Sequence, residues 1–314
     1  MSERSFVHIG APKSASTTLQ RSLLARHPQV LYFGEDGDGW ASADEARVGE
    51  LLLHADDLFF PAEQCSAQFA AKRAEAAART VVYSNVDVMG SRRPTTCAHR
   101  LHSLMPDAEV IVILRNQFTA LASFYANHGA FLKPAPPGYF RRHVALDDWL
   151  AWCTTFPTDT PAGGYLYGEI LDLYARLWGR EKIHLFLFED FIADPDAFVR
   201  RLAKLLDIDS DEAATLARDR HERPRNTARM LAWNRFYSRF LWGLSLPANL
   251  PGREGILRAW HRYLGAGAPA KIVIPARWHE RLVALYGEGN ARISRDYGLD
   301  LGRHGYPMIS DRHT

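Results

Sequence analysis

The sequence has few cysteines, no long apolar run and little net charge. Its 314 residues include three cysteines, Cys65, Cys97 and Cys153, which lie far apart and form no C-x-x-C pair. A reducing compartment is therefore expected, without a disulfide framework. No stretch approaches about 18 uninterrupted apolar residues, and the first residues show no basic region followed by an apolar one. We accordingly expect a cytoplasmic protein without a membrane partner.

Other classes of protein are also disfavoured by what is missing. The net charge of +2 gives no reason to expect nucleic acid as a partner. The sequence contains no zinc-ligand spacing, no Ser-His-Asp order and no G-x-G-x-x-G loop. A chain of this length can bury a large core, so its stability is expected to require no metal.

Short β-branched and apolar runs recur in the first two thirds of the chain, and helical patterns lie between them. The expected strands are 6–10, 80–84, 110–114 and 183–188; the expected helices include 16–26, 63–79, 118–127 and 166–178. This alternation predicts an α/β fold with a central parallel sheet flanked by helices. After residue 188 the sequence is mainly helical, notably at 194–206, 227–242 and 276–297. We expect one domain over 1–314, with the sheet core at 1–190 and a mainly helical part at 191–314 packed on it.

The segment Gly10–Thr18 joins the first expected strand to the first expected helix. Backbone N–H groups converge where a strand leads into a helix, and the helix N-terminus attracts anions. The segment, Gly-Ala-Pro-Lys-Ser-Ala-Ser-Thr-Thr, adds one cation and several hydroxyl donors. A phosphate-like group is therefore expected to bind here, through Pro12, Lys13, Ser14, Ala15, Ser16, Thr17 and Thr18. Capping of the helix by Ser16 or Thr17 is compatible with that role.

This segment differs from the nucleoside-triphosphate P-loop and resembles another anion loop. In the pattern G-x-x-x-x-G-K-[ST], Ala15 stands where glycine is required and Ser16 where lysine is required. The run His8–Gln20 instead resembles the 5′-phosphosulfate loop of sulfotransferases that use PAPS (3′-phosphoadenosine 5′-phosphosulfate). That loop usually reads P-K-[ST]-G-[ST]-[ST], so Ala15 replaces its glycine.

A second segment resembles the 3′-phosphate motif of the same family. The motif usually reads R-[ND]-P-x-x-R-x-x-S-x-[YF], and here Arg115, Ser123 and Tyr125 keep its spacing. Gln117 replaces the proline and Ala120 the second basic residue. Segment 182–195 resembles the family's strand and following helix, and segment 285–298 resembles C-terminal helices of its bacterial, carbohydrate-type members. The resemblance implies a P-loop-like sheet, with Arg115 and Ser123 binding the 3′-phosphate and Arg225, or Arg223, nearby.

The resemblance also implies an activity, the in-line transfer of the sulfuryl group from PAPS to a hydroxyl or amine. The acceptor would be a carbohydrate or small molecule, PAP would be the product, and no metal would be needed. Lys13 would neutralise the leaving oxygen. Asp87 is the first candidate for the general base and His128 the second, with His8 and His54 weaker alternatives.

Two other functions remain open at this stage. One is a small-molecule kinase with a degenerate P-loop, and the other a non-catalytic protein that binds PAP or PAPS. Segments 33–60 and 129–164, rich in glycine and proline respectively, are expected to be irregular. They would either shape the acceptor site or be surface excursions without a role. The sequence indicates neither the acceptor nor the oligomeric state.

Overall fold

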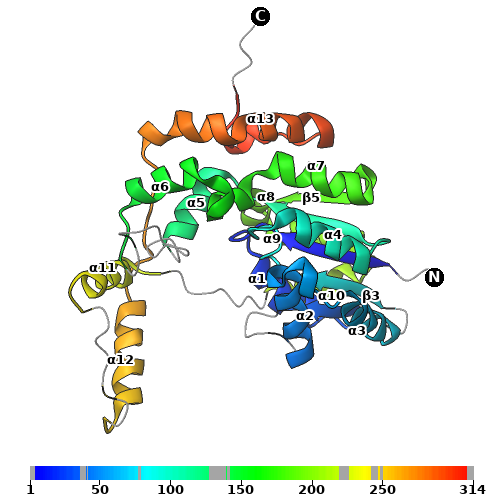
Figure 1. The fold of residues 1–314 in the computed structure, drawn as a ribbon, viewed down its shortest axis with the longest axis horizontal. Coiled ribbons are helices and arrows are strands. Elements are labelled where there is room, and N and C mark those ends of the chain that lie inside the picture. The colour runs from blue at the N-terminus through cyan, green and yellow to red at the C-terminus, as the bar shows by residue number, and fades with distance from the viewer. Residues whose placement is uncertain are drawn as a thin grey trace, which may run out of the picture. The chain divides into compact units, whose positions relative to one another are not determined.

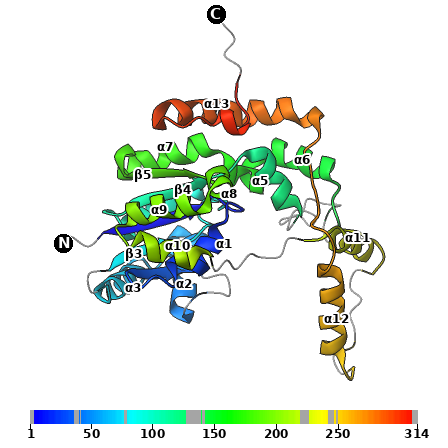
Figure 2. The same cartoon turned by 180° about the vertical axis from the view of Figure 1, so that it is seen from behind.

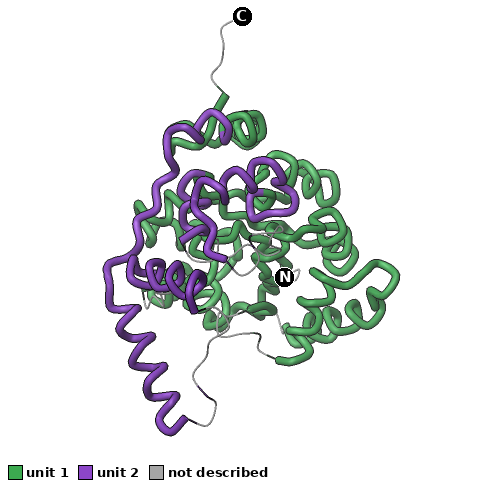
Figure 3. Tube along the Cα trace, turned by 60° about the vertical axis from the view of Figure 1, so that its left-hand side comes forward, with its two compact units in different colours: residues 1–117, 163–223, 283–314 green, residues 118–162, 224–282 purple. Residues whose placement is uncertain are grey.

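The chain folds into two compact units. The computed structural model describes residues 4–35, 40, 42–76, 79–126, 139, 142–218, 226–241, 247 and 250–309. Unit 1 comprises residues 1–117, 163–223 and 283–314, and unit 2 comprises residues 118–162 and 224–282 (Figure 3). The expectation of a single domain with a 1–190 core stays a prediction.

Unit 1 contains a five-stranded parallel sheet (Figure 1). The strands are β1 (Ser5–Gly10), β2 (Val30–Gly34), β3 (Thr80–Ser84), β4 (Glu109–Leu114) and β5 (Ile183–Leu187). Their order in the sheet is β2-β3-β1-β4-β5, and every neighbouring pair is parallel. Four of the five strands were expected from the sequence, and the expected fold class is confirmed.

Helices cover both faces of this sheet, as the opposite views in Figures 1 and 2 show. Phe6, Val82, Ile111 and Phe186 point to one face, where they form a continuous core with the apolar sides of three helical segments. Those segments are α1 (Ser16–Leu19) with its π-helical continuation η1 (Gln20–Leu24), α9 (Pro195–Leu206) and α10 (Ser210–Arg218). Strands buried on both sides explain why the sequence shows continuous apolar runs.

The helices α2 (Ala43–His54), α3 (Ala62–Ala74), α4 (Pro94–Leu104) and α7 (Tyr167–Trp178) belong to the other side of the sheet. Phe69 of α3 packs on Phe33 and Tyr83, with ring centroids 4.7 and 5.3 Å away. The indole of Trp178 donates to the carbonyl of Met105 at 3.0 Å, which joins the end of α7 to the turn before β4.

The remaining elements are helical, which confirms a mainly helical C-terminal part. They are α5 (Gln117–Phe124), α6 (Leu146–Thr155), α8 (Phe188–Ala193), α11 (Ala228–Phe236), α12 (Arg253–Gly265) and α13 (His279–Tyr297), the π-helix η7 (Tyr237–Leu241), and the 3₁₀ turns η2 (Asp57–Phe59), η4 (Pro157–Asp159), η5 (Pro161–Tyr165), η6 (Arg180–Lys182), η8 (Ala276–Trp278) and η9 (Gly302–His304). Among the described residues, no helix combines the length and apolarity that crossing a bilayer requires.

The expectation of irregular structure at 33–60 and 129–164 was wrong for much of both segments. The first contains the end of β2 and all of α2, and the described part of the second contains α6. Ser42 caps α2 by accepting from the N–H of Glu45 at 3.1 Å. A serine three residues before a glutamate is a helix-start signal, so α2 was detectable from the sequence.

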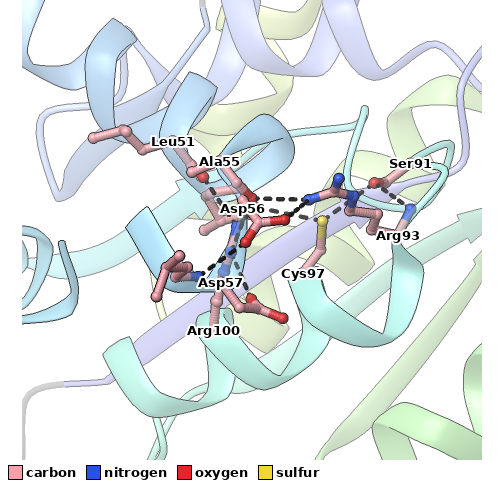
Figure 4. A network of polar contacts seen from close by, with 10 residues as sticks. Leu51, Ala55, Asp56, Asp57, Ser91, Arg93, Cys97 and Arg100 are labelled. Atoms are coloured by element: carbon pink, nitrogen blue, oxygen red, sulfur yellow. Dashed lines mark hydrogen bonds and ion pairs between the residues drawn. The ribbon is translucent and has the colours of Figure 1, made fainter. Parts of the chain in front are cut away.

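A buried arginine of α4 fixes the end of α2 (Figure 4). Arg100 donates to the carbonyls of Leu51 and Ala55 at 3.1 and 2.9 Å and to the carboxylate of Asp57 at 2.6 Å. Arg93 donates to the same Ala55 carbonyl at 3.1 Å. The last carbonyls of a helix lack intrahelical donors and carry partial negative charge. A guanidinium placed there stabilises the helix end and the turn after it.

Candidate functional site

The candidate site lies where β1, β3 and β4 end. The chain leaves β1 toward β2 on one side of the sheet and later builds β4 and β5 on the other. Ligands of open α/β sheets bind at such a switch, outside the carboxyl ends of the strands. The loops after these strands are joined to β1 and β4 by backbone hydrogen bonds. Ala11 donates to Ile113 at 2.9 Å, and Met89 donates to Ile9 at 3.3 Å.

The loop after β1 enters α1 through two residues with positive φ. Lys13 has φ 66° and Ala15 has φ 61°. Ala15 thus takes the left-handed conformation that the family's usual glycine would adopt without steric cost. It is also the residue that precedes α1, and it makes no side-chain cap. Because alanine has no oxygen to offer, it leaves the first N–H groups of α1 directed toward the loop, where an anion could accept from them.

The hydroxyls of this loop fall into two groups. The Ser14 hydroxyl, fully buried, donates to the carbonyl of Ala11 at 2.5 Å, and the buried Ser16 hydroxyl lies 3.3 Å from that of Ser14. Both brace the loop from inside. Thr17 and Thr18 are half-buried, so their hydroxyls are the more accessible donors. Anion binding by these four side chains stays a prediction.

Arg115 ties the loop to the end of β4. Its guanidinium donates to the carbonyl of Lys13 and lies over the ring of Phe188 at 4.4 Å. Its backbone is held in turn by the hydroxyl of Tyr167, which accepts from the Arg115 N–H at 3.1 Å and donates to the Arg115 carbonyl at 2.8 Å. The structure therefore brings together one residue from each sequence motif, the backbone of Lys13 and the side chain of Arg115.

Asp87 lies in the turn after β3, against the loop. Its N–H donates to the side chain of Asn85 at 3.1 Å, and it is exposed. A Cβ on Gly10 would lie 3.2 Å from both the Val86 carbonyl oxygen and the Met89 Cβ, so this turn packs directly on the start of the loop. The placement fits the expected position of a base, and its catalytic role stays a prediction.

The positions of the other predicted site residues relative to Arg115 stay predictions. Ser123 is half-buried on α5, in unit 2, so its approach to Arg115 stays a prediction. His128, Arg223 and Arg225 lie outside the described residues. No group of three or more His, Cys, Asp or Glu side chains able to hold a metal occurs within the described ranges.

Several residues of the site were missed by the sequence reasoning. The Tyr165 hydroxyl donates to the carbonyl of Pro12 at 3.1 Å, and Tyr167 holds Arg115. Burial raises the pKa of Tyr167 well above its ordinary value, so the hydroxyl stays protonated and can donate. These tyrosines precede or begin α7, about fifty residues after β4, and no local motif marks them.

Gln117 stands where the family's 3′-phosphate motif usually has proline, and its side chain makes contacts that a proline could not make. Its side-chain amide is fully buried and exchanges two hydrogen bonds with Asn290 of α13, at 2.9 and 3.2 Å. Asn290 also donates to the carbonyl of Pro307 at 2.8 Å. A buried amide pair satisfies its own polar groups, and the start of α5 is thereby attached to the C-terminal helix.

His8 is buried at the end of β1, before the loop, and its role as an alternative base stays a prediction. Its Nδ1 is 2.8 Å from the hydroxyl of Ser84, which also accepts from Gln20 at 2.9 Å. Complete burial lowers the pKa of His8 to about 4, so the imidazole is neutral at pH 7. His54, the other weaker alternative, has an exposed side chain 3.7 Å from the carboxylate of Glu50.

The fold and this loop define an α/β protein of the P-loop-like class. The model of the sulfotransferase family matches residues 6–212, and the chain belongs to that family. The resemblance noted from the two sequence segments is thereby confirmed. No curated protein sequence matches the chain.

Solved structures of sulfotransferases align with the chain, and the first of them shows the shared fold. A sulfotransferase from Alicyclobacillus acidocaldarius aligns with 96% of this chain and 99% of its own, with 16% identity and a TM-score of 0.55. The sulfotransferase domain from the curacin biosynthetic pathway covers 96% and 99%, with 13% identity and a TM-score of 0.46. Mouse sulfotransferase SULT7A1, solved in complex with PAP, covers 97% and 88%, with 12% identity and a TM-score of 0.43.

Acid should destabilise the protein through His8. The unfolded histidine titrates near pH 6.5, and the buried one near pH 4, so between these values the unfolded chain binds more protons. The free energy of unfolding should therefore fall as the pH drops from 6.5 to 4. Urea titrations should show the wild type losing about 3 kcal/mol more than His8→Asn over this window. His54→Asn is the control, and parallel curves for wild type and His8→Asn would contradict the assignment.

Proposed function

We propose that this protein transfers the sulfuryl group of PAPS to a hydroxyl or amine of a carbohydrate or small-molecule acceptor and releases PAP. One observation carries the proposal, which is the meeting of Lys13, the start of α1 and Arg115 at the end of the central strands. The family to which the chain belongs uses PAPS. The arrangement offers one cation and helix N–H groups for the phosphosulfate end and a second cation for a separate phosphate.

The residues of the loop would act on the leaving group. The S–O bond between the sulfur and the 5′-phosphate oxygen breaks as the acceptor atom bonds to the sulfur, and the electron pair stays on that oxygen. Lys13 and the N–H groups at the start of α1 would stabilise this developing charge. Sulfuryl transfer, like phosphoryl transfer, depends mainly on in-line positioning and on neutralising charge. A loop braced by Ser14 and Ser16 provides such positioning without reorganisation.

The 3′-phosphate would lie near Arg115. A guanidinium can offer two parallel donors to a phosphate, which suits a residue already fixed by stacking on Phe188. Ser123 and Arg225 are the further ligands that we propose for this phosphate. The proton of the acceptor would pass to Asp87, with His128 as the second candidate, because the turn carrying Asp87 packs on Gly10 at the start of the loop.

Two alternatives make different predictions. A small-molecule kinase would require ATP as its donor. The loop lacks the Gly-Lys dipeptide with which the nucleoside-triphosphate P-loop binds phosphates, which disfavours this alternative. A non-catalytic binder would hold PAP but form no product with any acceptor. Supplying labelled PAPS with a panel of glycans, phenols and amino alcohols would separate transfer from mere binding and would identify the acceptor.

PAP should stabilise the wild type more than AMP does, and ATP with Mg²⁺ should not stabilise it. A ligand at a hundred times its Kd adds about 2.7 kcal/mol to the free energy of unfolding, which thermal melts detect readily. In Arg115→Met the shift caused by PAP should shrink to that caused by AMP, because the 3′-phosphate contact is lost. Arg176→Met, at an exposed position of α7, is the control. If Arg115→Met lost the PAP and AMP shifts in melting temperature equally, Arg115 would only brace the loop. If ATP shifted the melting temperature of the wild type more than PAP does, the kinase would be favoured.

Lys13→Ala should lower kcat by about 10²–10³, because it removes one cation from the leaving oxygen. The measurement is transfer of labelled sulfate from PAPS to the best acceptor of the panel. Lys204→Ala, at an exposed position of α9, should keep the wild-type rate. A Lys13→Ala protein with undiminished turnover would remove Lys13 from this role.

Asp87→Asn should leave the stabilisation by PAP unchanged and lower the transfer rate by about 10²–10⁴, the usual contribution of a general base. The dependence of kcat on pH should lose its acidic limb at the same time. Asp107→Asn, also exposed, serves as the matched control. If Asp87→Asn transfers sulfate at the full rate, Asp87 is not the base and His128→Asn becomes the variant to measure.

A further inference from the structure

Unit 2 carries a row of aromatic side chains on α11, its continuation η7 and the helix α12. The ring of Phe240, in η7, lies 5.2 Å from that of Phe236, which lies 5.9 Å from Trp233 of α11. Trp233 packs edge to face on Trp260 of α12 at 4.8 Å, and Trp260 stacks on Tyr263 at 5.5 Å. We call these five residues the aromatic face. Figures 1 and 2 show α11 and α12, which carry it.

Much of this aromatic face is open to water. The exposed fractions are 47% for Phe236, 63% for Phe240, 37% for Trp260 and 54% for Tyr263, and the neighbouring Ile256 is 50% exposed. Single exposed apolar residues are ordinary, but a contiguous group of large ones marks a surface that meets something less polar than water. The aromatic face is therefore a candidate docking surface.

The helices that carry the aromatic face are strongly basic. The described stretches 226–241 and 250–265 contain six arginines and one glutamate, namely Arg229, Arg235, Arg239, Arg253, Arg258, Arg262 and Glu254. Arg229 lies over the ring of Tyr263 at 5.0 Å and Arg239 over the ring of Phe240 at 5.6 Å. Two of these arginines, Arg229 and Arg239, thus lie against rings of the aromatic face.

The sequence of α12 separates these two kinds of residue. Ile256, Trp260 and Tyr263 recur at i, i+4 and i+7 and so share one side of the helix, whereas Arg258 and Arg262 fall on the opposite side. A helix with aromatic and aliphatic residues on one side and arginines on the other is typical of segments that lie in the interface of a bilayer. Aromatic rings favour the headgroup level, and arginines are attracted to anionic headgroups.

We propose that the aromatic face docks on an anionic phospholipid surface, lying in its interface without crossing it. The inference departs from the expectation of no membrane partner, which rested on the lack of long apolar runs. Interfacial binding needs no such run, because only one side of each helix enters the headgroup region. It also does not depend on the proposed sulfotransferase activity.

Two other occupants fit the observations less well. A second copy of the chain docked through a twofold axis would bring this basic surface against itself, and like charges would repel. A dissolved polyanion would match the arginines but would leave Phe240 and Ile256 in water. An anionic bilayer offers complementary charge and an apolar layer together.

Flotation of the full-length protein with vesicles tests the proposal. The vesicles are phosphatidylcholine alone, or phosphatidylcholine with about a third phosphatidylglycerol, at about 0.05 M and 0.5 M salt, since screening weakens attraction to the surface. We expect the wild type to partition at least about tenfold more strongly onto the anionic vesicles at low salt. Added salt should reduce this preference. No binding to anionic vesicles at low salt would overturn the proposal.

Variants at exposed positions separate charge, aromatic contact and fold. Arg258→Gln with Arg262→Gln should lower partitioning onto anionic vesicles about tenfold, and Phe240→Ser with Tyr263→Ser should lower it with little change in its salt dependence. Arg47→Gln with Arg176→Gln, exposed arginines of unit 1, removes the same charge and should bind as the wild type does. Unchanged melting temperatures would show that the variants fold.

Three results would contradict the proposal. The unit 1 control could lose as much binding as the α12 arginine variant, which would make the attraction unspecific. Sedimentation could show a dimer that Phe240→Ser dissociates, which would assign the aromatic face to a second copy. Alternatively, heparin could bind as tightly to the aromatic variants as to the wild type while vesicles do not bind, which would assign the surface to a polyanion.

Discussion

The hydrogen bond from the Arg115 guanidinium to the Lys13 carbonyl is the interaction on which the rest of the site depends. It joins the loop after β1 to the end of β4, the neighbouring parallel strand. Arg115 can make it because Tyr167 holds its backbone and Phe188 supports its guanidinium. The guanidinium is therefore held in place by the protein itself, and such a preorganised charge would cost little to align during the proposed reaction.

That interaction also offsets strain in the loop. Lys13 and Ala15 both have positive φ, at a cost of roughly 1–2 kcal/mol each for residues that carry a Cβ. Internal hydrogen bonds contribute about 1 kcal/mol each, and the loop has them from Ser14, from Tyr165 and from Arg115. Strain that persists only because the surroundings compensate it is a feature of functional loops. The loop is thus shaped by its neighbours, so an alanine can stand where relatives have glycine.

A structural feature of this protein could be predicted from the sequence only where the residues that form it lie close together along the chain. Strands buried on both faces give continuous apolar runs, and an anion loop gives a short motif, so four strands and the Lys13 loop were predictable. β2 was missed because its five residues, Val30–Gly34, run directly into glycines that suggest a loop. Tyr167 and the Gln117–Asn290 pair could not be predicted, because their partners lie 52 and 173 residues away and only the folded chain brings them together.

The net charge of this protein does not show where its basic residues lie. Basic side chains occur at the loop with Lys13 and Arg115 and in the stretches around α11 and α12. The whole chain has 38 basic and 36 acidic residues, yet six arginines and one glutamate fall in the described stretches around α11 and α12. Setting these aside leaves 32 basic and 35 acidic residues, so the remainder is slightly acidic. Screening limits the reach of a surface charge to about 8 Å at physiological salt. The proposed binding of a small anion by Lys13 and Arg115 in unit 1 and the proposed docking of the unit 2 arginines on a larger surface are therefore both compatible with a near-zero net charge.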